Sequence, residues 1–218
     1  MLQKKSVEKP LWDILKKLQK DKTFEKYFLV GGTALALQIG HRISFDIDLF
    51  TRENINKDEI FDYMNRNYNG KYQIHNIQNT ILQISINNIK IDFVKYDYDF
   101  IEEIKNDNGI KFLGKKDISA MKLMAVANRG DQAKDFIDIF YLLKEIQLKE
   151  MFEYYKIKYK QNDISPIKRS LVYFDDITES NWLSVKLLHD DLSIETIKKS
   201  IIDKMNIYNK DIIEKICC

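Results

Sequence analysis

The acids with the clearest chemical potential are Asp46 and Asp48, which alternate with apolar residues in the run FDIDLF at 45–50. This alternation has the period of a β-strand, so both carboxylates should lie on one face, roughly 6 to 7 Å apart at Cβ. Asp92 alternates in the same way in the run IKIDFV, and a neighbouring strand would bring it beside the pair. Carboxylate oxygens are the ligands that Mg²⁺ prefers. The three acids therefore predict a site for two magnesium ions, with manganese as an alternative.

A glycine pair, Gly31-Gly32, separates an apolar run at 27–30 from the helix-forming run TALALQIG at 33–40. A glycine turn that opens a helix offers free N–H groups and the positive end of the helix dipole to a phosphate. Neither motif is specific alone, because Gly-Gly is usually only a turn and Asp-x-Asp is often a solvent-facing strand. Found about fourteen residues apart, the two motifs favour a site for a nucleoside triphosphate.

Basic side chains that could meet a triphosphate flank these motifs. Lys122 interrupts an apolar run, and a positive charge in that setting usually pairs with an anion, here a phosphate. Arg129 follows seven residues later on the same helix face, although a solvated helix face is the better explanation for it. Lys134 and Asp138 have i, i+4 spacing, so an ion pair within the helix is their alternative. Arg42 either touches phosphate or pairs with the acids and orients them.

Hydrophobic periodicity divides the chain into an α/β part and a helical part. The elements expected in the first part are a helix with Pro10 in its first turn, a strand at 27–30, a helix at 33–40, a strand at 45–50, a helix at 57–67, and a meander of strands at 71–77, 80–86 and 90–94 with Asn87-Asn88 as its last turn. Helices at 117–129 and 132–146 and about three weaker ones follow. We therefore predict an α/β lobe over residues 1–110 and an all-helical lobe over 111–218, with the boundary in the segment 105–116.

Charge and composition limit the classes of partner. The chain has 35 basic and 33 acidic side chains, so its net charge indicates no polyanionic ligand. Locally, residues 1–26 hold eight lysines against four acids, and residues 111–134 hold six basic residues against two acids, which would suit an acceptor such as tRNA. No apolar run approaches the roughly 20 residues of a membrane span. The two cysteines, Cys217 and Cys218, are adjacent and cannot close a structural loop, so we expect reduced thiols and a cytoplasmic protein with no membrane contact.

The order of these motifs resembles the AbiEii/AbiGii toxin family of nucleotidyltransferases, within the polymerase-beta-like superfamily. The matching stretches are Gly31-Gly32-Thr33-Ala-Leu35, Arg42-x-Ser44-x-Asp46-x-Asp48-Leu49, Lys122-x-x-Ala125-x-x-x-Arg129 and Lys134-Asp135-x-x-Asp138-x-x-x-Leu142. The resemblance covers roughly residues 27–143. Ser44 stands where threonine is common in the family and keeps the hydroxyl group.

The resemblance implies a minimal nucleotidyltransferase fold, in which a mixed-sheet N-lobe precedes an all-helical C-lobe. It implies transfer of a nucleoside monophosphate from an NTP to an acceptor hydroxyl, which in some relatives belongs to tRNA. It also implies the toxin half of a toxin-antitoxin or abortive-infection system, with a cognate antitoxin protein as partner. The predicted catalytic residues are Asp46, Asp48, Asp92, Lys122 and Asp138, with the first three binding metal. The predicted nucleotide-binding residues are Gly31, Gly32, Thr33, Arg42, Ser44, Lys122, Arg129 and Lys134.

Two other functions fit the same residues. A small-molecule nucleotidyltransferase of the antibiotic-modifying kind would need an acidic acceptor cleft, which Asp175, Asp176 and Glu179 could supply. A nucleotide-binding module without catalysis would keep the fold but would not need all three acids. Metal-dependent release of pyrophosphate would separate an enzyme from such a module.

Overall fold

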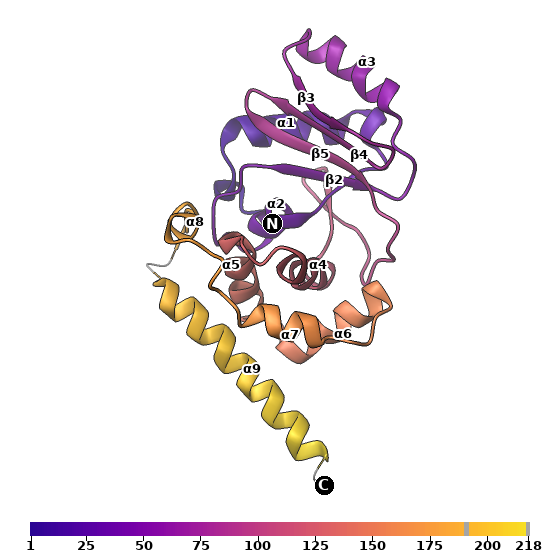
Figure 1. The fold of residues 1–218 in the computed structure, drawn as a ribbon. Coiled ribbons are helices and arrows are strands. Elements are labelled where there is room, and N and C mark those ends of the chain that lie inside the picture. The colour runs from indigo at the N-terminus through magenta and orange to yellow at the C-terminus, as the bar shows by residue number, and fades with distance from the viewer. Residues whose placement is uncertain (190–191, 217–218) are drawn as a thin grey trace. The chain divides into compact units, whose positions relative to one another are not determined.

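The structure, a computed structural model, describes residues 1–189 and 192–216. Cys217 and Cys218, expected to be reduced thiols, lie outside the described residues. The chain forms two compact units, residues 1–114 and 115–218. Figure 1 shows the chain as a ribbon, with labels on helices α1 to α9 and strands β2 to β5.

A mixed seven-stranded sheet forms the centre of the first unit, every residue of which the structure describes. Its strands are β1 (Phe28–Leu29), β2 (Ile47–Thr51), β3 (Gln73–Ile77), β4 (Ile81–Ile86), β5 (Ile89–Lys95), β6 (Lys105–Asp107) and β7 (Ile110–Phe112). Their order across the sheet is β3-β4-β5-β2-β1-β7-β6. The pairs β2–β5 and β1–β7 are parallel, and the remaining neighbours are antiparallel. The predicted mixed sheet is confirmed.

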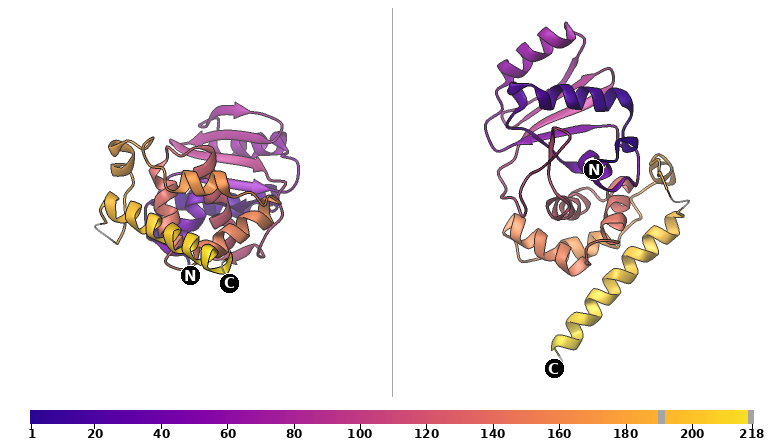
Figure 2. Two further views of the ribbon diagram at one scale, coloured as in Figure 1. Left: turned by 60° about the horizontal axis from the view of Figure 1, so that its bottom comes forward. Right: turned by 180° about the vertical axis from the view of Figure 1, so that it is seen from behind.

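One face of this sheet packs against helices and forms the core of the first unit. The short helix η2 (Lys22–Phe24) places Phe24 against Phe93 of β5, with ring centroids 5.4 Å apart, and against Tyr63 of α3 (Lys57–Tyr68), at 4.9 Å. The helix α1 (Lys9–Lys20) buries its apolar stripe and crosses the sheet in the rear view of Figure 2. Because side chains alternate along a strand, the residues next to Phe93 in sequence point to the opposite, polar face.

The glycine pair and the Asp46 segment differ slightly from the predicted elements. Helix α2 (Gly31–Ile39) begins at Gly31, so the glycines form its first turn instead of preceding it. Strand β2 begins at Ile47, so Asp46 lies just before the strand. Phe45, which also precedes the strand, is 44% exposed.

The segment expected to hold only the domain boundary also contains a β-hairpin. Asn108 and Gly109 both have positive φ, 56° and 77°, which is the geometry of a tight two-residue turn between β6 and β7. Strand β7 then pairs with β1 and joins the sheet. The two-domain division stays a proposal, with its junction better placed after Gly114 because residue 110 is the first of β7.

The second unit is helical in its described part, as predicted. It contains α4 (Lys115–Asn128), α5 (Ala133–Leu142), α6 (Leu148–Tyr159), α7 (Ser165–Leu171), α8 (Glu179–Leu183) and α9 (Ile194–Ile216). Helix α4 contacts α5, α6 and α7, while α9 contacts α5 and α6. Within the described residues, no helix combines the length and the apolar character that crossing a bilayer requires.

Candidate active site

The central feature of the site is a pair of acids on adjacent parallel strands. Asp48 of β2 lies directly opposite Asp92 of β5, so the two residues are separated by one strand spacing, about 4.8 Å. The Asp92 side chain is 15% exposed, and its Oδ1 atom is buried without a hydrogen-bond partner. Two neighbouring carboxylates repel each other unless a cation lies between them. Their donor atoms and the unpaired Oδ1 therefore suit a hard divalent cation such as Mg²⁺.

Because Gly31 has no side chain, the Asp48 carboxylate can pack against the start of α2. The φ of Gly31 is +67°, and a Cβ atom added there would lie 2.6 Å from Asp48 Oδ2. Only glycine satisfies both the backbone conformation and the space. The Val30 N–H donates to the Asp48 carbonyl at 2.9 Å, which fixes the strand beside the helix entrance. The positive end of the helix dipole therefore faces a carboxylate.

Three residues predicted to bind nucleotide contact one another or the backbone near Asp46, and their contact with nucleotide stays a prediction. The Thr33 hydroxyl donates to the Asp46 carbonyl and lies 2.8 Å from Ser44 Oγ. Arg42 Nη1 donates to the Ile43 carbonyl at 3.1 Å and to Ser44 Oγ at 3.4 Å. Thr33, Arg42 and Ser44 are all buried. The contacts of Arg42 with Ile43 and Ser44 leave both of its predicted roles, phosphate contact and orientation of the acids, as predictions.

Asp46 does not form a compact three-acid cluster with the other two. Within residues 1–189 and 192–216, no three His, Cys, Asp or Glu side chains converge as a metal-binding group. The geometry therefore brings together Asp48 and Asp92, with Asp46 immediately before β2. A role for Asp46 as a metal ligand stays a prediction.

A second cluster of predicted residues lies in the helical unit. Lys122 Nζ of α4 is 2.6 Å from both Asp135 Oδ1 and Asp138 Oδ2 of α5, and all three side chains are buried. Arg129, whose side chain is 60% exposed, lies 3.6 Å from Asp135 Oδ2. Lys122 was expected to pair with phosphate, and within this unit it pairs with the carboxylates of Asp135 and Asp138. Contact of Lys122, Arg129 or the half-buried Lys134 with phosphate stays a prediction.

Two residues in these clusters were given no role by the sequence. Asp135 stands in a quoted motif, and its position three residues before Asp138 places it on the same helix face. Gln83 of β4 donates from Nε2 to Asp92 Oδ2 at 2.8 Å. Nothing in the sequence identifies Gln83, because its contact depends on the register between two strands.

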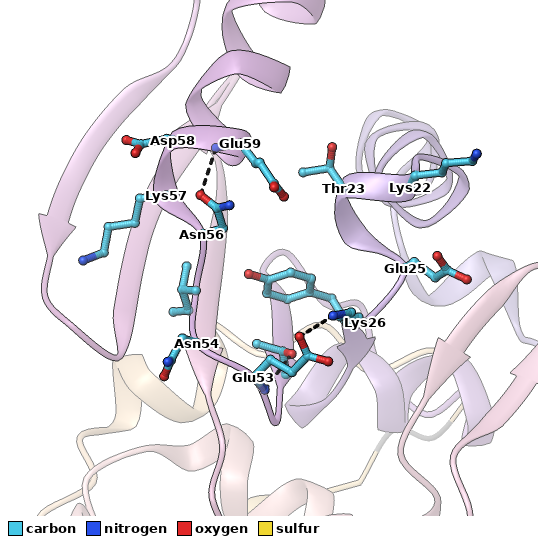
Figure 3. A pocket seen from close by; sticks show the side chains of 13 residues that line it. Lys22, Thr23, Glu25, Lys26, Glu53, Asn54, Asn56, Lys57, Asp58 and Glu59 are labelled. Atoms are coloured by element: carbon cyan, nitrogen blue, oxygen red, sulfur yellow. Dashed lines mark hydrogen bonds and ion pairs between the residues drawn. The ribbon is translucent and has the colours of Figure 1, made fainter.

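A pocket of about 690 Å³ lies at the opposite end of β2 from the acid pair (Figure 3). Thr51, the last residue of β2, lines it together with Lys26, Glu53 and Glu59, and an ion pair joins Lys26 to Glu53. Burial, assisted by Glu59 and Glu53, raises the pKa of Tyr27 in this pocket to about 12, so the hydroxyl is neutral near pH 7. The mixed charges select no class of ligand, and the pocket lies about 10 Å along the strand from Asp48.

The fold is that of nucleotidyltransferases. A putative nucleotidyltransferase from H. pylori has a TM-score of 0.55 at 17% identity, with 94% of each chain covered. JHP933 from Helicobacter pylori has a TM-score of 0.53 at 16% identity, with 94% of this chain and 91% of that chain covered. At such low identities, these likenesses concern the fold alone.

Sequence comparison identifies the family within this class. Residues 13–192 match the family described as nucleotidyl transferase AbiEii toxin, type IV TA system. An uncharacterized protein of Aquifex aeolicus, aq_aa25, is 35% identical in an alignment of 166 residues that covers 73% of this chain and 79% of that protein. The chain belongs to the AbiEii family, so the resemblance seen in its motifs is confirmed. It is a nucleotidyltransferase toxin of the type IV class, which implies an NTP substrate and an antitoxin.

Proposed function

We propose that this toxin transfers a nucleoside monophosphate from an NTP to a hydroxyl of tRNA, in a reaction that depends on Mg²⁺. The observation that carries the proposal is the register of β2 and β5, which sets Asp48 beside Asp92 at the start of α2. In this proposal the acceptor oxygen forms a bond to the α-phosphorus, the bond to pyrophosphate breaks, and the acceptor proton passes to a base. Asp92 is our candidate for that base.

The positions of the residues assign them to metal binding, phosphate binding or support of the backbone. Asp48 and Asp92 would hold the metal, with Asp46 completing the set. Magnesium bound there supplies charge neutralisation for the polyphosphate and alignment of the attacking and leaving oxygens. The N–H groups of the first turn of α2, from Gly32 onward, would bind phosphate oxygens. Thr33 and Ser44 would hold the backbone that carries Asp46.

The choice of tRNA as acceptor rests on local charge and on the family. The lysine-rich segment 1–26 offers a surface that a polyanion would prefer. Both tRNA and NTPs are cytoplasmic, so we place the reaction in the cytoplasm, with a cognate antitoxin as the partner that restrains it. The acids considered for a small-molecule acceptor, Asp175 and Asp176, are exposed in the helical unit.

The test is transfer of label from each of four α-labelled NTPs to total bacterial tRNA, with and without magnesium. The variants Asp48→Asn and Asp92→Asn keep the side-chain size and remove the charge. We expect each to reduce transfer about 100-fold or more, because several kcal/mol of transition-state stabilisation depend on the metal. Asp97→Asn is the matched control, because Asp97 follows β5 and its side chain is 72% exposed.

The outcomes separate the competing functions. Label on RNA that disappears in both site variants and persists in the control supports the proposal. Transfer to aminoglycosides, with none to RNA, would replace tRNA by a small-molecule acceptor. No pyrophosphate from any NTP, together with retained NTP binding, would make the protein a nucleotide-binding module.

A further inference from the structure

We propose that Gln83 of β4 is a positioning residue that fixes the carboxylate of Asp92 and leaves one of its oxygens for the metal or the acceptor proton. This inference rests on the proposed function, because it assigns Asp92 to the reacting site. Gln83 lies outside every motif that led to that site. It would act through Asp92 and not by touching the substrate.

The geometry between β4 and β5 gives each Asp92 oxygen a different environment. Gln83 lies directly opposite Asp92 in the antiparallel ladder, and its Nε2 donates to Asp92 Oδ2 at 2.8 Å. Oδ1 of the same carboxylate is buried and has no hydrogen-bond partner. A buried carboxylate oxygen without a partner is costly, so such atoms usually mark a binding or catalytic role. Anchoring Oδ2 therefore determines where Oδ1 points.

Asn76 on the edge strand β3 sets the orientation of the Gln83 amide. Asn76 Nδ2 donates to Gln83 Oε1 at 3.3 Å, and Asn76 lies opposite Gln83 in the ladder. Because Oε1 faces this donor, Nε2 must face Asp92. The reversed amide would place two acceptors, Oε1 and the carboxylate, against each other. The row Asn76, Gln83, Asp92 and Asp48 thus crosses four neighbouring strands at one level.

A β-bulge in β3 places Asn76 opposite Gln83. Ile74 lies opposite Ile84 and Asn76 opposite Gln83, so His75 is one extra residue on β3. His75 Nε2 lies 2.8 Å from Ser85 Oγ, and Ser85 shares the sheet face of Gln83 because they are two residues apart. Both His75 and Asn76 therefore reach the face that carries the acids. Bulges that redirect side chains occur often beside active sites.

A neutral amide suits this task better than a cation would. Lys90 Nζ also lies 3.1 Å from Asp92 Oδ2, but its side chain is 48% exposed and its charge is screened by water. A lysine in contact neutralises the carboxylate and so competes with a metal ion. Gln83 fixes the same oxygen and leaves the negative charge for the metal. The two contacts therefore have opposite effects on metal affinity.

The test compares Gln83→Met, which keeps the length but removes the donor, with Gln73→Met. Gln73 is an exposed residue of β3 and serves as a control of the same chemical change. Binding of Mn²⁺ to the full chain without NTP, measured by electron paramagnetic resonance, is the first readout. We expect about tenfold weaker Mn²⁺ binding in Gln83→Met, the size typical of residues that orient a metal ligand. We expect kcat to fall by a similar factor while KM for the NTP stays close to wild type.

Further variants separate failure of this inference from failure of the proposed function. Asp92→Asn that still binds Mn²⁺ and still transfers label like wild type would remove Asp92 from the reacting site and overturn both. Loss of binding in Asp92→Asn, with wild-type binding in Gln83→Met, would overturn only the positioning role. Equal losses in Gln83→Met and Gln73→Met would also overturn it. If Gln83→Met does not fold, Asn76→Leu tests the same row, with an expected loss of about threefold.

Discussion

At the scale of single residues, the contact between Gly31 and Asp48 joins the two motifs that first indicated a site. The glycine is needed for its positive φ and because the carboxylate occupies the space of a side chain. The positive φ affects folding alone. The contact with Asp48 also makes the position of its carboxylate depend on residue 31, so one substitution at Gly31 should lower stability through the backbone and activity through Asp48.

We predict that Gly31→Ala costs about 1–2 kcal/mol in stability from its positive φ and also displaces the Asp48 carboxylate. Gly70→Ala is the matched control, since Gly70 has φ +74° and nothing within 4 Å of an added Cβ. Thermal unfolding should show a comparable loss from the φ change in both variants, and the label-transfer assay should show lost activity only for Gly31→Ala. Full activity in a folded Gly31→Ala protein would contradict this account.

At the scale of elements, the sequence contained enough information for those with a clear period or a strong turn. The meander of β3, β4 and β5 was predicted from alternation, and Asn87-Asn88 indeed has the positive φ values of its turn. The hairpin of β6 and β7 was not predicted, although Asn108-Gly109 is a strong turn signal, because three-residue strands are too short to show alternation.

Contacts across elements were harder to predict than the elements themselves. Asp92 was expected beside Asp48 because both alternate along strands, and the register agrees. The Gln83 contact needs the exact pairing of β4 with β5, and the bulge at His75 shifts the next strand by one residue. Lys122 illustrates the same limit. Its place in an apolar run predicts an anionic partner, named as phosphate, whereas Asp135 and Asp138 contact it within the helical unit.

Helices α4 and α6 are joined by a buried ion pair that no motif indicated. Lys158 Nζ lies 2.6 Å from Asp117 Oδ1, and both side chains are fully buried. We predict that Lys158→Met lowers the free energy of unfolding by about 3–5 kcal/mol in chemical denaturation, because it leaves the buried carboxylate of Asp117 without its cation. The double variant Lys158→Met/Asp117→Leu should recover most of this loss.

The control for that experiment lies two residues away on the same helix. Lys156 forms an ion pair with Glu153 at 2.8 Å, but the glutamate side chain is 51% exposed. Lys156→Met should therefore cost less than about 1 kcal/mol. Equal losses for Lys156→Met and Lys158→Met would show that burial does not set the strength of the Lys158 pair.

At the scale of the whole molecule, net charge and motif order carry different information. The order of motifs over residues 27–143 sufficed to indicate the family, to which the match over 13–192 assigns the chain. A formal charge of +2 says little about the acceptor. If tRNA is the acceptor, binding must come from local lysines, and their contributions should differ from those of equal charges elsewhere.

Helix α1 offers the sharpest test of this point. Lys16 and Lys20 are exposed one turn apart, and neither has an ion-pair partner in the part of the chain that the structure describes. Lys16→Gln/Lys20→Gln should weaken tRNA binding and reduce the slope of log K against log salt concentration by about 2, because each phosphate contact releases a counterion. Lys199→Gln/Lys204→Gln on α9 changes the formal net charge equally. Filter binding at several salt concentrations should give a wild-type slope for the α9 variant. Equal reductions in both variants would mean that tRNA responds to total charge and not to the α1 surface.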